Sequence, residues 1–218
     1  KGEGRTVIFV SHNMGAVQNL CQKGIVLERG TAKSFDKIEE ALEGYLESLK
    51  SNSRQKIEER VDRGGNGKVR IADMILVNGR NDLPTESVSS GDEVLFKIKY
   101  LAREYKGDSI KEIQIGLAIF NSHEQFVTVL NNKMANFTFI DAPVNGELVC
   151  KISRLPLMFG DFTVKITLLV DGEVSDRIDN AFNFYVNQSD FYKSGVINVN
   201  NRQGVYVDQS WNLVASVL

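Results

Sequence analysis

Apolar side chains recur at every second position through much of residues 94–186, and this alternation constrains the fold more than any other feature of the sequence. Successive side chains of a β-strand point to opposite faces of its sheet, so the alternation predicts strands with one buried face. About seven such strands predict an antiparallel sandwich, in which two sheets pack their apolar faces together. The predicted inward-facing positions are Val94, Phe96, Ile98 and Tyr100; Ile113, Ile115, Leu117 and Ile119; Leu148, Cys150 and Ile152; Phe162, Val164, Ile166, Leu168 and Val170; and Phe182, Phe184 and Val186.

Turn signals separate these runs. The pairs Asn78-Gly79, Asn145-Gly146 and Asp171-Gly172 are typical of tight turns between antiparallel strands, because both residue types tolerate positive φ angles. Beyond a polar loop, the segment 205–213 predicts one further strand. We therefore expect a sandwich over residues 67–187 and a C-terminal tail over residues 188–218 that adds a strand, exchanged between the subunits of a dimer.

The first fifty residues follow a different pattern. Residues 6–10 form a continuous apolar run, which predicts a strand covered on both faces of a parallel sheet. Residues 24–28 predict a second strand, and apolar spacing over residues 38–49 predicts a helix, with Asp36 placed to cap it and Glu39 to complete a capping box. Residues 51–66 are polar and glycine-rich at their ends, so they predict a linker between an α/β part, residues 1–50, and the sandwich.

Composition excludes several classes of protein. The net charge of −2 comes with scattered basic residues, so we expect no nucleic-acid partner. Two cysteines, Cys21 and Cys150, are too few for a disulfide framework, and we expect no metal site. Apolar runs are far shorter than the roughly 20 residues that cross a bilayer. The start without methionine, close to an apolar strand, is what we expect of a fragment of a longer protein.

The segment from Thr6 to Met14, which reads TVIFVSHNM, resembles the switch-histidine segment of ABC-transporter ATPases, and Cys21 followed by GIVLERG at residues 24–30 extends the resemblance. The resemblance implies that His12 contacts the γ-phosphate of ATP in the parent protein, which would bind ATP and Mg²⁺. The chain has no phosphate-binding loop, signature motif or Walker B carboxylate, so we expect no enzymatic activity and no cofactor in this fragment.

The sandwich half resembles the C-terminal domain of O-antigen exporter ATPases, the Wzt family. The residues that carry this resemblance are Gly67 and Ile71, the run Val88-Ser89-Ser90-Gly91-Asp92, and LMFGDFTV at residues 157–164. The resemblance implies an immunoglobulin-like sandwich that recognises the finished, often capped end of a lipid-linked O-polysaccharide before export. It also implies a homodimer, a transmembrane permease partner, and a cytoplasmic location at the inner membrane of a Gram-negative bacterium.

A sugar chain needs flat apolar faces and a few planar polar groups, so we searched the outward-facing positions of the predicted strands. Gly116, Ala118 and Ala181 lack bulk and predict a hollow. An arginine, Arg177 or Arg154, is expected to face the site if the glycan carries an acidic cap. The predicted carbohydrate-binding residues around the hollow are Gln114, Lys165, Thr167, Asn183 and Tyr185.

Three alternatives stay open at this point. The five polar residues also fit the ordinary solvated face of a sheet. The sandwich and tail also fit a dimerisation or regulatory domain without a glycan ligand, in which Trp211 is a packing anchor or subunit contact. A glycoside hydrolase would need two carboxylates facing each other in a cleft, whereas the chain offers acidic residues in a pattern typical of solvated turns. Those residues are Asp161, Asp171, Glu173, Asp176 and Asp179.

Overall fold

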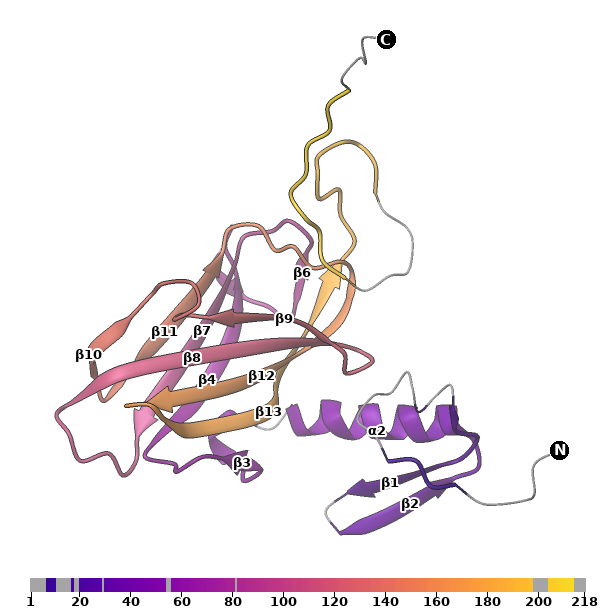
Figure 1. Ribbon diagram of the computed structural model, residues 1–218, viewed down its shortest axis with the longest axis horizontal. Coiled ribbons are helices and arrows are strands. Elements are labelled where there is room, and N and C mark those ends of the chain that lie inside the picture. Colours follow the sequence, from indigo (N-terminus) through magenta and orange to yellow (C-terminus); the bar gives the residue numbers. More distant parts are fainter. Residues whose placement is uncertain are drawn as a thin grey trace, which may run out of the picture.

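The chain is mainly β and forms an antiparallel sandwich, which confirms the predicted fold class (Figure 1). The structure is a computed structural model that describes residues 7–10, 17, 20–28, 30–53, 56–80, 82–197 and 204–213. Beside the sandwich, at the lower right of the view, lie a small hairpin and a helix from the N-terminal part, and a tail leaves the sandwich at the upper right. The switch-histidine candidate, His12, lies outside the described residues.

The larger sheet has seven strands, in the order β10-β8-β12-β13-β3, with β9 also paired to β8 and β6 to β13. All these pairs are antiparallel except that of β6 and β13. A turn at Asp171-Gly172 with positive φ angles joins β12 to β13, as the sequence predicts. The strands of this sheet are β3 (Arg63–Gly64), β6 (Ser87–Ser89), β8 (Ser109–Asn121), β9 (Phe126–Asn131), β10 (Phe139–Pro143), β12 (Gly160–Val170) and β13 (Glu173–Asn187).

The smaller sheet has four strands in the order β11-β7-β4-β5. Its members are β4 (Val69–Asn78), β5 (Leu83–Pro84), β7 (Val94–Ala102) and β11 (Asn145–Ile152). The Asn145-Gly146 pair begins β11 rather than forming a turn, so that turn prediction was wrong. Gly146 faces Tyr100 on β7, and a Cβ atom there would stand 2.6 Å from the tyrosine hydroxyl. The glycine is therefore explained by a close side-chain approach and not by turn geometry.

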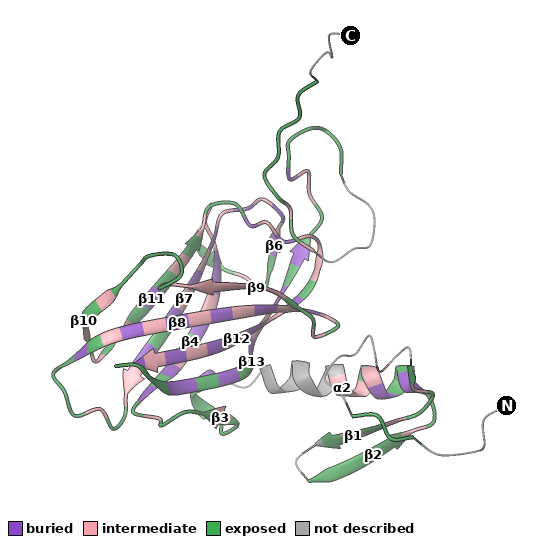
Figure 2. Cartoon of the chain, in the orientation of Figure 1, coloured by how far each residue is buried: buried purple, intermediate pink, exposed green. Residues whose placement is uncertain are grey.

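The core lies between the two sheets and is built by the alternating positions (Figure 2). Every second residue is buried from Ile113 to Asn121 in β8 and from Phe162 to Val170 in β12, and the residues between them are partly exposed. Three phenylalanines join the layers: the ring of Phe184 stands edge-on to Phe96 at 5.8 Å and stacks on Phe162 at 5.7 Å. Burial of these apolar faces supplies the main driving force for the fold.

The N-terminal part forms a hairpin of β1 (Gly24–Glu28) and β2 (Thr31–Phe35), packed against α2 (Ile38–Ser53). Contact is close at Gly24, where an added Cβ atom would stand 2.4 Å from the Cβ atom of Ala41. The predicted strand β1 and helix α2 are confirmed. Asp36, the predicted helix cap, forms an ion pair with Lys23.

Residues 7–10 differ from the expected buried strand. They have no strand assignment, and Val7, Ile8 and Val10 are each more than four-fifths exposed. A strand requires a hydrogen-bonded neighbour, and none of the described strands pairs with this segment. The apolar pattern therefore does not produce a strand here.

The second half of the predicted linker belongs structurally to the sandwich. A short 3₁₀ helix, η1 (Ile57–Glu59), lies in this segment, and β3 pairs with β13 soon after it. Ile57 and Arg60 are both buried. The linker is therefore fixed to the sheet from about residue 57 onward.

Candidate functional site

The five predicted carbohydrate-binding residues lie on three neighbouring strands of the larger sheet. Gln114 is on β8, Lys165 and Thr167 are on β12, and Asn183 and Tyr185 are on β13. Each lies between inward-facing core residues of its strand, so all five belong to the outer face of that sheet. The structure thus brings together on one face the residues that the sequence pattern grouped.

Strand pairing arranges this face in rows. Thr167 pairs with Gly116 of β8 and with Arg177 of β13, and Lys165 pairs with Ala118. Because Gly116 and Ala118 have little or no side chain, the polar groups of β12 stand beside low positions on β8. The register thus places small residues of β8 beside the polar residues of β12, where the sequence predicts a hollow.

The next row joins Phe120, Thr163 and Asn183 across β8, β12 and β13. The Thr163 hydroxyl donates a hydrogen bond to Asn183 Oδ1 over 2.9 Å, which fixes the side chain of Asn183. Tyr185 pairs with Asp161 at the end of the face and is 40% exposed, while Gln114 pairs with Leu169 at the other end. Fixed amides and exposed aromatic rings are the groups that orient a saccharide.

Ala181 does not belong to this face, contrary to the prediction. It is 2% exposed and packs in the core cluster. The cause is an irregularity in β13: Phe182 pairs with Val164 and Ile178 with Ile166, so three residues of β13 stand opposite the single residue Lys165. Strict alternation fails within such a bulge, because its unpaired residues need not follow the parity of the strand, although Ile178 before it and Phe184 after it both face the core.

The same bulge adds an acidic residue to the outer face, although the sequence pattern assigned that residue to a solvated turn. Asp179, within β13, forms an ion pair with Lys165. The Lys165 side chain is 26% exposed and that of Asp179 is 73% exposed, so the ammonium group is held partly within the face. Only the sheet register identifies this pair, since 14 positions separate the two residues in sequence.

The two candidate arginines lie in different parts of the structure. Arg177 is exposed on β13 beside Thr167 and so adjoins the outer face. Arg154 lies at the end of the sandwich, where its guanidinium covers the ring of Phe191 at 3.7 Å and donates hydrogen bonds to the Phe191 carbonyl and to Asp208. Arg154 therefore holds the tail and does not adjoin the outer face.

The tail is docked through aromatic contacts around Arg154. Phe191 stacks on Tyr206 at 4.4 Å, and the Tyr192 hydroxyl donates to the Val207 carbonyl. Val205 forms a single β-bridge with Leu157. The described residues 204–213 contain no strand, so the strand predicted there is not formed. An open cleft of about 680 Å³ adjoins this region, and Arg80, Arg154 and Tyr192 line part of it.

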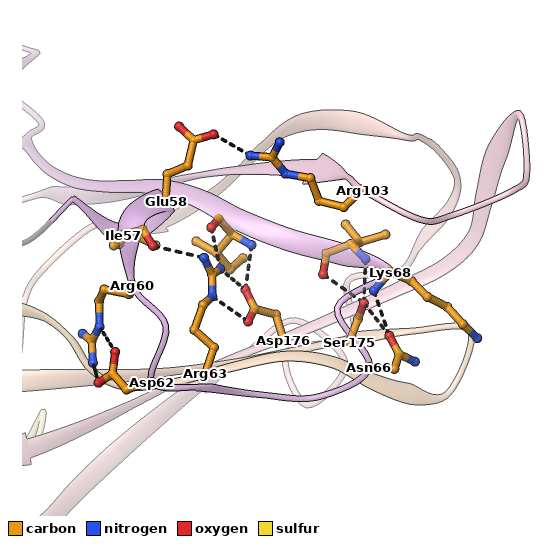
Figure 3. Close-up of polar contacts among 12 residues, drawn as sticks. Ile57, Glu58, Arg60, Asp62, Arg63, Asn66, Lys68, Arg103, Ser175 and Asp176 are labelled. Carbon is orange, nitrogen blue, oxygen red and sulfur yellow. Dashed lines mark hydrogen bonds and ion pairs between the residues drawn. The ribbon is translucent and has the colours of Figure 1, made fainter. Parts of the chain in front are cut away.

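The acidic residues expected in solvated turns lie mostly in strands. Asp176, expected in a solvated turn, is 1% exposed within β13 and forms an ion pair with buried Arg63 (Figure 3). Its carboxylate also accepts a hydrogen bond from the Ile71 amide over 2.7 Å, so it joins the linker to both sheets. Asp161, Glu173 and Asp179 are likewise strand residues rather than turn residues. Among the described residues, no group of three His, Cys, Asp or Glu side chains lies close enough to hold a metal ion.

The described helices include none that is long and apolar enough to cross a membrane. Both cysteines are free, and burial raises the pKa of the Cys150 thiol.

Comparisons with known proteins agree with this architecture. Two curated proteins, each named teichoic acids export ATP-binding protein TagH, are similar over short stretches. The protein from Bacillus anthracis is 36% identical over 62 residues, which are 28% of this chain and 11% of that protein. The protein from Staphylococcus saprophyticus is 37% identical over 57 residues, which are 25% of this chain and 22% of that protein. The match thus spans less than a quarter of either relative.

A solved structure, the crystal structure of the C-terminal domain of wzt, shares the fold. It aligns with 75% of this chain and 94% of its own, at a TM-score of 0.54 and 14% sequence identity. The model of the family described as Wzt C-terminal domain matches residues 60–199, which include the whole sandwich and the start of the tail. Because this match covers more than half of the chain, the protein belongs to the Wzt C-terminal domain family.

Proposed function

We propose that the sandwich is the polysaccharide-recognition module of an ABC exporter and that it binds the end of a lipid-linked O-polysaccharide before export. The observation that carries this proposal is the outer face of β8, β12 and β13, where Gln114, Lys165, Thr167, Asn183 and Tyr185 lie together beside Gly116 and Ala118. Membership of the Wzt C-terminal domain family supports the same assignment.

The N-terminal residues suggest the setting of this module. The relatives that match part of the chain are named as ATP-binding proteins of a polymer exporter. We infer that the parent protein is the ATP-binding subunit, that it binds ATP and Mg²⁺ with His12 near the γ-phosphate, and that it works with a membrane permease. In this account the sandwich lies in the cytoplasm at the inner membrane of a Gram-negative bacterium.

Calorimetric titration with O-polysaccharides of different structure tests the proposal. We expect saturable binding of one O-polysaccharide and no comparable binding of the others or of a teichoic acid. Asn183→Ala and Tyr185→Ala should each weaken binding roughly 5- to 10-fold, because each removes about one hydrogen bond or ring contact. Lys99→Ala is the matched control, since Lys99 is an exposed residue on the smaller sheet. Equal binding of every polymer, or equal loss in the control, would contradict the proposal.

A second candidate function is dimerisation through the tail, and it rests on a separate observation. Trp211 and Leu213 are 90% and 97% exposed, and Val207 is 66% exposed. Trp211 is therefore not an internal packing anchor, and its apolar surface is available to a second copy of the chain. The two functions are compatible, because the tail leaves the end of the sandwich and not its outer face.

A further inference from the structure

The bulge of β13, residues 179–181, lies opposite Lys165 and is held from the other side by the linker. Arg60 of the linker is 3% exposed and donates hydrogen bonds to the carbonyl groups of Asn180 over 2.6 Å and of Asp179 over 2.8 Å. A bulge removes carbonyl groups from the sheet ladder, and buried carbonyls need another donor. Arg60 is that donor, and its charge is balanced by Asp62 at 2.5 Å.

Helix α2 also contacts β13 (Figure 1). Tyr45 of α2 is hydrogen-bonded to Glu124, which lies in the turn between β8 and β9, and it also lies within the electrostatic influence of Asp179. Burial, followed by these two carboxylates, raises the pKa of Tyr45 to about 12. The tyrosine therefore stays a neutral hydrogen-bond donor at physiological pH.

Asp179 connects this junction to the outer face. Its backbone carbonyl accepts the hydrogen bond from Arg60, and its side chain forms the ion pair with Lys165. Residues 179–181 of β13 thus connect the linker to the proposed glycan face, and Tyr45 of α2 lies near Asp179 in the same segment.

We propose that the β13 bulge is a joint through which α2 and the linker hold the glycan face in its binding arrangement, with Asp179 as the positioning residue for Lys165. This inference rests on the proposed function, because it treats Lys165 as a glycan-binding residue. Docking of α2 and occupancy of the face are then coupled, and the coupling is reciprocal. Undocking α2 weakens glycan binding, and glycan binding protects α2 from opening.

The first test measures glycan affinity of the full chain by calorimetry. Tyr45→Phe keeps the ring and removes the hydroxyl, so we expect affinity to fall by up to about fivefold, the worth of one hydrogen bond. Tyr105→Phe is the matched control, because the Tyr105 hydroxyl also donates to a carboxylate, that of Asp171, over 2.8 Å but away from the bulge. Unchanged affinity in Tyr45→Phe, or an equal loss in both variants, would overturn the joint.

The second test needs no glycan and so separates failure of the joint from failure of the proposed function. Hydrogen exchange of the α2 amides is compared between the full-length wild type and Lys165→Met, which leaves Asp179 without its cation. We expect severalfold faster exchange in α2, whereas Thr167→Val, two residues away on the same face, should leave it unchanged. Unchanged exchange in Lys165→Met would refute the joint even if the glycan binds. Faster exchange in a chain that binds no glycan would keep the joint and refute the proposed function.

Discussion

At the scale of single residues, the charged pairs that join distant segments of this protein include both buried and exposed ones. Arg63 and Asp176 have side chains that are 5% and 2% exposed, and Arg63 also donates to the carbonyls of Ile57 and Ile71. The pair Lys68–Glu173 spans a similar distance along the chain, but its members are 49% and 65% exposed. Solvent screens the exposed pair, whereas the buried pair is satisfied only by its partners.

Replacing Arg63 by methionine should therefore destabilise the protein far more than replacing Lys68. Arg63→Met leaves the Asp176 carboxylate buried without its cation, which costs about 3–5 kcal/mol of unfolding free energy. Lys68→Met removes an exposed pair and should cost less than about 1 kcal/mol. Urea unfolding, followed by far-ultraviolet circular dichroism, measures the unfolding free energy of both variants. Similar losses in the two variants would show that Arg63 is not a structural link between linker and sheet.

At the scale of elements, alternation predicts the central strands well because they are long and buried on one face. The inward-facing residues predicted for β7, β8 and β12 are all buried. Irregular elements do not follow the alternation, for two different reasons. Gly146 marks a close approach to Tyr100 and not a turn, and the β13 bulge places Ala181 in the core. Neither a cross-strand contact nor an extra residue in one strand is visible in local spacing.

The candidate site was predictable to the same extent. Five outer-face residues follow from alternation alone, because strand parity assigns the face. Asp179 does not, because its pairing with Lys165 depends on how β12 and β13 are registered around the bulge. The pairing of segments that are far apart in sequence, such as Arg60 with the carbonyl of Asn180, likewise depends on the tertiary fold.

The described part of the tail carries the exposed apolar side chains of Val207, Trp211 and Leu213. Trp211→Ser should lower self-association measured by sedimentation velocity and leave the unfolding free energy of the monomer nearly unchanged, because the side chain is 90% exposed. Phe126→Ser is a control at another exposed aromatic residue, 60% exposed on β9. Self-association that is unchanged by Trp211→Ser, or reduced equally by both substitutions, would remove the tail from the dimer contact.

At the scale of the whole molecule, the linker with α2 and the C-terminal tail attach to the sandwich at different places. The linker and α2 reach the larger sheet at the β13 bulge, and the tail leaves from the end where Arg154 and Phe191 lie (Figure 1). The bulge stands opposite Lys165 within the outer face of β8, β12 and β13, and this face runs along β12 from Asp161 to Leu169, a length of about 27 Å.

The most direct test of the central claim is to map the bound glycan on the sandwich by nuclear magnetic resonance. The labelled full chain is titrated with the O-polysaccharide that binds in calorimetry, and amide shifts are followed residue by residue. The account predicts the largest saturable shifts on the outer face, at Gly116, Thr167 and Asn183, and negligible shifts at Lys99 on the smaller sheet. Shifts confined to the smaller sheet or to the cleft beside Arg154 would contradict it, as would no shifts on addition of the polysaccharide.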